Sequence, residues 1–178
     1  MNEVQRIQDQ LLVLRAQANP EALDALVRRW NPALLRHAMR YTRNTDVAWD
    51  VVQEAWCAIY RKLEGLKDAA AFPKWAFCVV TNKCRDYARS EKRRSEVMQA
   101  FTVELKKPDP PATGNKRLDA ALARIDPDQR VLLELFYVES FSIREIAEIT
   151  GSPEGSIKSR LYRARQELKR LMEDEKDG

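Results

Sequence analysis

Glycine, histidine and cysteine are scarce in this chain of 178 residues, which holds five glycines, one histidine and three cysteines. It has no glycine-rich phosphate-cradling loop, and the three cysteines and the single histidine, His37, do not show a zinc-type spacing. Cys57, Cys78 and Cys84 cannot all pair with one another, so we interpret them as small residues in the helical cores of a reduced protein. We expect no metal, no cofactor and no catalytic residue, although an enzyme with a composite site stays open as an alternative.

Long hydrophobic runs are also absent. No apolar run is long enough to span a bilayer, and the N-terminal stretch MNEVQRIQDQ is too polar for a signal peptide. We therefore expect a cytoplasmic protein without membrane insertion. Hydrophobic residues make up 44% of the chain, enough for a folded core, and the net charge of +4 is modest. Nucleic-acid binding would therefore depend on local basic patches.

Strand-like alternation of polar and apolar residues is missing, whereas apolar residues recur at intervals of three and four over long stretches. In the second of the predicted helices, Asn19 is the expected N-cap, Pro20 the first residue, and Pro32 the point of a kink or division. The pattern predicts helices over residues 4–18, from 20 to about 35, 45–63 and 72–92.

A composition change separates two parts of the chain. Residues 106–115, KKPDPPATGN, hold three prolines and a glycine, which excludes a helix there. Apolar periodicity resumes after this stretch. We therefore predict an all-α protein of two small helical domains, residues 1–95 and 116–178, joined by a flexible linker over 96–115.

A helix-turn-helix pattern lies in the C-terminal domain. Ser142 and Glu145 have the spacing of a capping box at the start of a short helix, which ends at Gly151. Ser152 and Pro153 are expected to be the N-cap and first residue of a second helix. A short helix, a tight glycine turn and a second helix are typical of DNA-binding modules.

The second helix of this pattern is predicted to bury one face and expose a basic one. Residues 154–170 contain six basic and two acidic residues. A solvated surface helix is the alternative, but the capped turn before it favours DNA binding. The expected buried stripe is Ile157, Leu161, Ala164 and Leu168. The groups that suit base edges or phosphates are on Ser156, Lys158, Ser159, Tyr162, Arg163 and Gln166.

A second basic region covers residues 74–94, with seven basic and two acidic residues. We interpret Phe72, Phe77 and most of Trp75 as core, while cations and an amide beside aromatic residues suit a separated DNA strand. An amphipathic helix with a merely solvated basic face is the alternative. The candidate strand-binding residues are Lys74, Asn82, Lys83, Arg85, Arg89 and Arg93.

The helix expected over residues 45–63 is apolar on most of its circumference. One apolar side can face its own domain, and the other, with Trp49, Trp56 and Tyr60, can face a protein partner. A fully internal helix of a larger bundle is the alternative. The polar residues that would orient the protein partner on this helix are Asp50, Gln53 and Glu54.

Together these stretches resemble the extracytoplasmic-function (ECF, group IV) sigma factors of the sigma-70 family. The resemblance covers nearly the whole chain, and NKCRDYAR and GSIKSRLYRAR are its most specific parts. It implies a transcription initiation factor that binds core RNA polymerase and promoter DNA and has a cognate anti-sigma factor as an expected partner. It implies that the helix-turn-helix recognises the upstream promoter element, while the N-terminal domain melts and reads the downstream element.

The resemblance also implies residue roles. Asp50, Gln53 and Glu54 match the polymerase-contact motif of the family, and the helix after Gly151 matches the upstream-element reader. In the family's N-x-x-x-D-x-x-R pattern, Asp86 is expected to make a helix-to-helix contact. The pattern is met by Asn82, Asp86 and Arg89.

Trp49 departs from the small or acidic residue that is usual in the family, so this surface is open to contact with a protein besides polymerase. A helix-turn-helix regulator that never meets polymerase is an alternative, but it leaves residues 46–63 and 82–94 without a role. A sigma mimic that captures an anti-sigma factor is another, but such proteins usually carry a receiver domain, which this sequence lacks.

Overall fold

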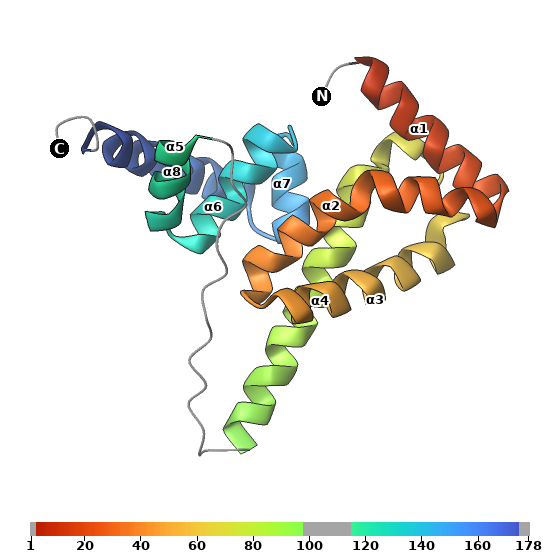
Figure 1. Ribbon diagram of the computed structural model, residues 1–178, viewed down its shortest axis with the longest axis horizontal. Helices are drawn as coiled ribbons and strands as arrows, with labels where there is room; N and C mark the ends of the chain where they lie inside the picture. Colours follow the sequence, from red (N-terminus) through yellow and green to blue (C-terminus); the bar gives the residue numbers. More distant parts are fainter. Residues whose placement is uncertain (1–2, 98–114, 175–178) are drawn as a thin grey trace. The chain divides into compact units, whose positions relative to one another are not determined.

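The computed structural model describes residues 3–97 and 115–174, and every regular element within these two ranges is helical (Figure 1). The chain divides into two compact units, Met1–Lys107 and Pro108–Gly178. The prediction of an all-α protein with a C-terminal helix-turn-helix is confirmed. Most of the predicted linker, residues 98–114, lies outside the described residues.

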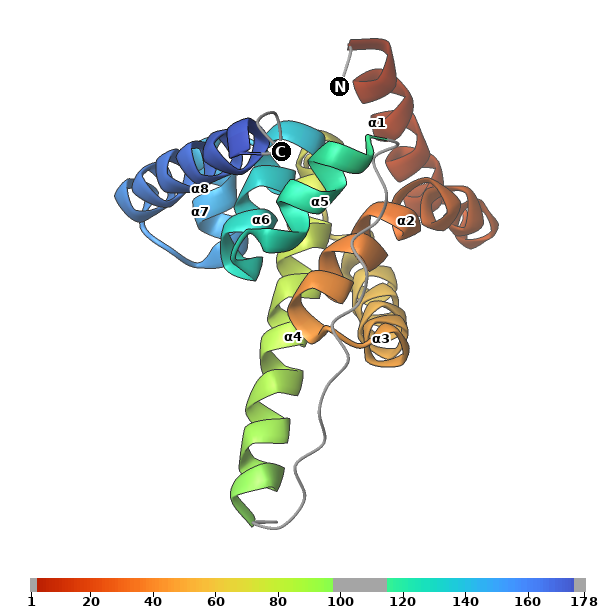
Figure 2. The same ribbon diagram turned by 60° about the vertical axis from the view of Figure 1, so that its left-hand side comes forward.

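The first unit is a bundle in which α2, α3 and α4 pack against one another, and α1 lies on α2 (Figures 1 and 2). Its core is formed by fully buried aliphatic and aromatic side chains, such as Leu26, Leu34, Ile59, Phe72 and Phe77. The second half of α4 extends well beyond the other helices of this unit in both views. The elements are α1 (Glu3–Ala18), η1 (Pro20–Ala22), α2 (Leu23–Thr42), α3 (Thr45–Leu63), η2 (Ala69–Ala71) and α4 (Phe72–Val97).

Side-chain caps set several helix boundaries in this unit. The Asn44 side chain accepts the backbone N–H groups of Asp46 and Val47, so α3 begins where the sequence predicts. Asn19 is also a cap, but it starts the short 3-10 turn η1, and α2 begins only at Leu23. A proline at the first position tolerates either type of turn, which explains this difference from the prediction.

Helix α2 continues without interruption through Pro32, so of the kink or division predicted there, the division is wrong. Pro32 is exposed, whereas its neighbours Trp30, Ala33 and Leu34 are buried in the bundle. A proline inside a helix removes one backbone hydrogen bond. Burial of the adjacent side chains offsets that loss and holds both halves of α2 in one helix.

His37 is a fully buried polar residue between α2 and α4. Its Nε2 lies 2.8 Å from the hydroxyl oxygen of Thr81, and the rings of Tyr41 and Phe77 pack against it edge-on at 5.1 and 4.9 Å. Burial, with a smaller contribution from the nearby Arg40 guanidinium, lowers the pKa of His37 from 6.5 to about 3. The imidazole is therefore neutral at physiological pH.

We expect acidification to destabilise the first unit through His37. Below pH 6.5 the imidazole of His37 binds a proton in the unfolded chain, but in the folded chain it stays unprotonated down to about pH 3. The free energy of unfolding therefore falls as the pH is lowered through this window. Between about pH 7.5 and pH 5 the loss is about 2 kcal/mol. Urea unfolding at both pH values measures it. Because the chain has one histidine, His37→Gln should flatten this pH dependence, and an unchanged slope in that variant would contradict the assignment.

The second unit contains four helices and one π-helical turn within its described residues. Ala121, Leu135, Ile146, Ile157 and Leu171 form the centre of its core and are almost wholly buried. Helices α5, α6 and α7 all contact α8, which therefore holds the unit together. The elements are α5 (Lys116–Arg124), α6 (Pro127–Leu133), η3 (Glu134–Val138), α7 (Ile143–Thr150) and α8 (Glu154–Asp174).

The turn between α7 and α8 is built from local hydrogen bonds. The Ser142 and Glu145 side chains each accept the other's backbone N–H, so the predicted capping box is confirmed. Gly151 ends α7 with a φ of 58°, a left-handed conformation that glycine adopts without strain. Its N–H and that of Ser152 donate to the carbonyls of Glu148 and Ala147, which satisfies the end of the helix.

The predicted start of α8 is wrong by one residue. Ser152 belongs to the end of α7, and its hydroxyl donates to the Thr150 carbonyl at 3.4 Å. The Pro153 carbonyl accepts the first helical bond, from the Ile157 N–H, so α8 begins at Glu154. The sequence pattern of a serine before a proline fits both arrangements, and only the closure of α7 over Gly151 distinguishes them.

Candidate nucleic-acid and protein interfaces

Helix α8 buries one face and exposes another, as the sequence predicts. Ile157, Leu161 and Ala164 are buried, whereas Leu168 is only half-buried and Leu171 replaces it in the core. The predicted stripe is therefore correct over its first two turns and shifts at its end. Of the six candidate DNA-binding residues, Ser156 is half-buried, and the exposed ones are Lys158, Ser159, Tyr162, Arg163 and Gln166.

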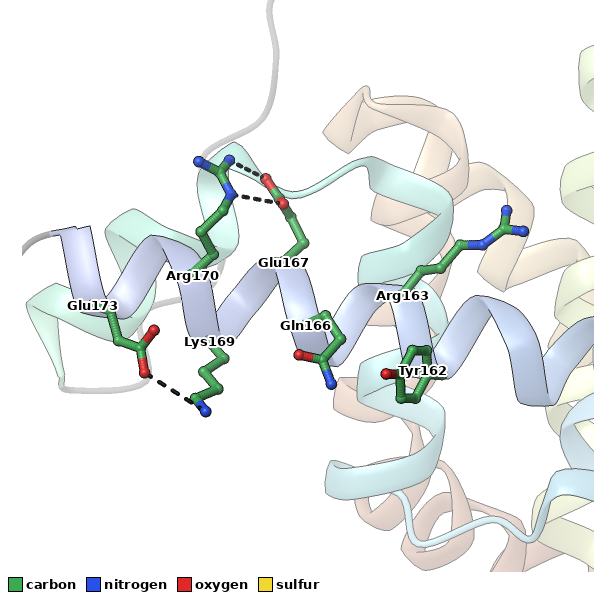
Figure 3. A pocket seen from close by; sticks show the side chains of 7 residues that line it. All are labelled: Tyr162, Arg163, Gln166, Glu167, Lys169, Arg170 and Glu173. Carbon is green, nitrogen blue, oxygen red and sulfur yellow. Dashed lines mark hydrogen bonds and ion pairs between the residues drawn. The ribbon is translucent and has the colours of Figure 1, made fainter.

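The positive charge of α8 is unevenly compensated. Figure 3 shows that Arg170 makes two hydrogen bonds to Glu167, at 2.7 and 3.1 Å, and that Lys169 pairs with Glu173. The Arg170 guanidinium lowers the pKa of Glu167 and keeps that carboxylate charged. These pairs neutralise the end of the helix, from residue 167 to residue 173.

The part of α8 that precedes Glu167 keeps its charge. Arg160 reaches Asp128 at 3.4 Å, but Lys158, Arg163 and Arg165 make no ion pair with any residue that the structure describes. Tyr162 is 58% exposed, and it lies beside Arg163 and Gln166 on the outer side of the helix (Figure 3). The uncompensated cations therefore lie among the groups that can contact base edges.

Arg165 is a candidate that the sequence pattern did not single out. It is exposed, is not paired within the described chain, and lies one turn after the exposed Tyr162. Arg165 lies near the edge of the apolar stripe, so a helical projection of the sequence does not place it on the exposed basic face. The observation that identifies it is the absence of an acidic partner among the described residues, and this can be seen only in the tertiary structure.

In α4, Asn82 and Arg89 are exposed and Arg85 is half-buried. Asp86 pairs with Arg89 on its own helix at 2.5 Å, so the expected helix-to-helix contact of Asp86 is wrong. The reason is geometric, because Asp86 is exposed and the partner that it contacts among the described residues, Arg89, lies one turn away on the same helix.

The remaining residues of the α4 candidate set are spread along the helix. Lys74 is half-buried near its start, whereas Arg93 is exposed near its end and its Nε donates to the Arg89 carbonyl at 3.4 Å. Phe72 and Phe77 are buried, as predicted, and the half-buried Trp75 packs edge-on against Phe72 at 6.1 Å.

Asp50, Gln53 and Glu54 are all exposed on one side of α3. They line a shallow open recess together with Cys57, Arg61 and Lys83. The Lys83 ammonium lies 2.9 Å from the Glu54 carboxylate, so the structure brings one member of the α4 candidate set into contact with these polar residues of α3. We call these six residues the α3 recess.

The aromatic residues of α3 divide into two kinds. Trp49 and Tyr60 are half-exposed beside the α3 recess, as expected for a protein-contact surface. Trp56 instead packs on Phe72 with ring centroids 6.5 Å apart, and its indole N–H donates to the Asn31 side chain at 3.0 Å, so it belongs to the bundle.

The cysteines also divide. Cys84 is buried, and desolvation raises the pKa of its thiol to about 12, which keeps it protonated and unreactive. Cys78 is half-buried. Cys57 is exposed in the α3 recess, so its expected place in a core is wrong.

Among the described residues, no three or more histidine, cysteine or acidic side chains form a group able to hold a metal ion. None of the described helices is both long and apolar enough to cross a membrane.

Comparison with known proteins gives a family for both units. Residues 26–94 match Sigma-70 region 2, and residues 115–168 match Sigma-70, region 4. The ECF RNA polymerase sigma-E factor of Haemophilus influenzae is 29% identical to this chain and covers 91% of it, and the match covers 94% of that protein. The ECF RNA polymerase sigma factor EcfG of Rhodopseudomonas palustris is 31% identical, over 79% of this chain and 80% of that protein.

Solved structures agree with these matches. The sigma factor RpoE of Bartonella quintana, in complex with the anti-sigma factor NepR, has a TM-score of 0.66 and 25% identity, and the match covers 85% of this chain and 96% of that one. CnrH, in complex with the cytosolic domain of CnrY, shares the fold with a TM-score of 0.61 at 24% identity, over 93% and 97% of the two chains. The chain therefore belongs to the ECF RNA polymerase sigma factors of the sigma-70 family, the transcription initiation factors that direct RNA polymerase to promoters.

Proposed function

We propose that this sigma factor binds core RNA polymerase through the α3 recess, recognises the upstream promoter element with α8, and reads and melts the downstream element with α4. The observation that carries the proposal is the pairing pattern of α8, whose cations without an ion pair to any described residue lie near Tyr162 and Gln166. A helix that merely kept the protein soluble would have no reason to concentrate them there.

The charge of α8 suits base recognition as well as phosphate binding. A guanidinium such as that of Arg163 can donate two bonds to a guanine edge, whereas the Lys158 ammonium acts as a point charge. Buried Ile157 and Leu161 hold the helix on its unit, so the opposite side is the one that can enter a major groove.

The outer half of α4 suits a separated strand. Asn82, Arg85 and Arg89 recur along one side of a helix that extends beyond the bundle (Figures 1 and 2), and Arg93 continues the series. Charges along this side can follow phosphates, while the Asn82 amide can bond to an unpaired base. The Asp86–Arg89 pair would orient the guanidinium for this contact.

Replacement of Asn82 and Arg85 by alanine should impair promoter melting more than initial duplex binding, because only separated strands expose unpaired bases. Polymerase association should be unchanged, and permanganate reactivity of promoter thymines in the open complex should fall severalfold. Arg94→Ala is the matched control, because Arg94 is exposed, pairs with Glu91 and lies off this side of α4. Normal thymine reactivity in the double variant would refute a role in strand capture.

The α3 recess offers polymerase two carboxylates and an amide, with Trp49 and Tyr60 at its border. Polar groups of this kind set orientation, and aromatic side chains supply most of the affinity in protein interfaces. Because Lys83 pairs with Glu54, we assign Lys83 to this recess in addition to the proposed contact with DNA.

The same proposal assigns residues 1–95 to polymerase binding and the downstream element, and residues 116–178 to the upstream element. Its place of action is the cytoplasm, and it needs no catalytic residue of its own, because polymerase carries the chemistry. Of two solved relatives, one is in complex with an anti-sigma factor and the other with the cytosolic domain of a partner. We propose that this chain is also bound by an anti-sigma factor.

The test is run-off transcription on genomic promoter fragments with purified core polymerase, with and without this chain. Promoter-specific transcripts that require the chain are expected. Tight binding of the chain to promoter duplex without polymerase, together with no chain-dependent transcript on any fragment, would favour a helix-turn-helix regulator instead.

A further inference from the structure

Helix α1 exposes an aliphatic stripe that the promoter and polymerase surfaces do not use. Val4, Ile7, Leu11 and Leu14 are 61%, 52%, 47% and 52% exposed. The helix precedes the region 2 match, which begins at residue 26. Four such side chains in one line form an apolar patch of a few hundred Å², about the size of the largest patch on an ordinary monomer, and such patches are often functional.

The bundle fixes the rotation of α1, so the stripe cannot turn inward. The buried Asp9 carboxylate accepts two bonds from the Arg29 guanidinium, at 2.7 and 3.1 Å. At the other end of the helix, the Gln17 amide donates to the carbonyls of Leu63 and Leu66, each at 2.8 Å. A rotation that buried the stripe would expose Val13 and Ala16 and break these polar contacts.

The spacing of the stripe specifies a helical partner. Intervals of three, four and three residues are the a and d positions of two heptads, the seam along which two helices pack side by side. Two heptads are too short for a stable free coiled coil, but the bundle already holds α1 as a helix. Docking therefore needs no further ordering of the α1 backbone.

The stripe is complementary to itself in the antiparallel direction. In that arrangement Val4 of one copy lies opposite Leu14 of the other, and Ile7 opposite Leu11, so each layer pairs a β-branched side chain with a leucine. The residues that border the centre of the seam are Gln8 and Gln10. Each would meet its own copy, and amides can both donate and accept, so no like charges oppose one another.

We propose that α1 is a dimerisation helix, on which the α1 helix of a second copy of this chain docks antiparallel about a two-fold axis level with Asp9. Two stripes bury less than the roughly 1,200 Å² of a standard stable interface, so the dimer is weak and reversible. The proposal uses neither α8 nor the α3 recess, and it stands independently of the proposed function.

Sedimentation equilibrium of the full chain, from low to high micromolar concentration, tests the proposal. The wild-type chain should show a reversible monomer–dimer equilibrium, and Leu11→Asp should raise its dissociation constant about tenfold or more. Leu11→Gln adds no charge and should weaken the dimer less. Val138→Asp is the matched control, because Val138 is an exposed aliphatic residue of the second unit, and it should leave the equilibrium unchanged.

Thermal unfolding separates loss of docking from loss of fold. Leu11 is about half-exposed, so Leu11→Asp should melt near the wild-type temperature. A mixture of Leu11→Asp and Ile7→Lys chains should form heterodimers, because the antiparallel register places the new carboxylate opposite the new ammonium. A monomeric wild type at every concentration, a dimer insensitive to Leu11→Asp, or a mixture without heterodimers would each overturn the proposal.

Discussion

Replacement of Asp50 and Glu54 by lysine is expected to lower the affinity of this sigma factor for core RNA polymerase by about 2–5 kcal/mol, because like charges would then oppose each other across the interface. Both carboxylates are exposed on α3, so the substitution should leave the fold of the first unit intact. Competition for core polymerase against a labelled wild-type chain measures the effect. Transcription should fall in parallel, since promoter recognition depends on the assembled enzyme.

The Glu54–Lys83 pair provides the control for this experiment. If Glu54 acts only by pairing with Lys83, the charge-swapped chain carrying Glu54→Lys and Lys83→Glu should regain wild-type affinity. We expect it to stay defective, because the swap restores the internal pair but not the charge that faces polymerase. Full recovery in the swapped chain would remove Glu54 from the polymerase interface, and undiminished affinity in the double lysine variant would remove the α3 recess from it.

Replacement of Arg163 by alanine should cost about 1–3 kcal/mol of promoter affinity and relax base preference at one position of the upstream element. Arg163 is exposed and has no ion-pair partner among the described residues, so its guanidinium is available to a guanine edge. Selection from a promoter library by polymerase carrying wild-type or variant chain measures both effects.

Two neighbouring residues serve as controls for Arg163. Lys158→Ala should weaken binding to all sequences about equally and reduce its salt dependence, because an ammonium contacts phosphate as a point charge. Leu161→Ala removes a buried side chain and should lower stability by about 2–5 kcal/mol without changing the preferred bases. Identical motifs and stringency for wild type and Arg163→Ala would show that α8 binds DNA only as a basic surface.

Local patterns in the sequence determined the helices and much of the site. Helix α3 begins and ends at the predicted residues, because Asn44 caps its start through two adjacent N–H groups. The capping box of Ser142 and Glu145, and the left-handed turn at Gly151, depend on residues within a few positions of one another. Interactions of this range are fully present in the sequence, which is why its periodicity also predicted the exposed face of α8.

The tertiary structure decided which exposed residues have partners and which apolar stripe faces outward. Lys83 and Glu54 are 29 positions apart and meet only because α3 packs on α4. In α1, the larger aliphatic side chains face solvent because distant groups, Arg29 and the carbonyl of Leu63, hold the opposite face against the bundle. Periodicity identifies a stripe but not the direction it faces, since that depends on the free energy of contacts between segments far apart in the chain.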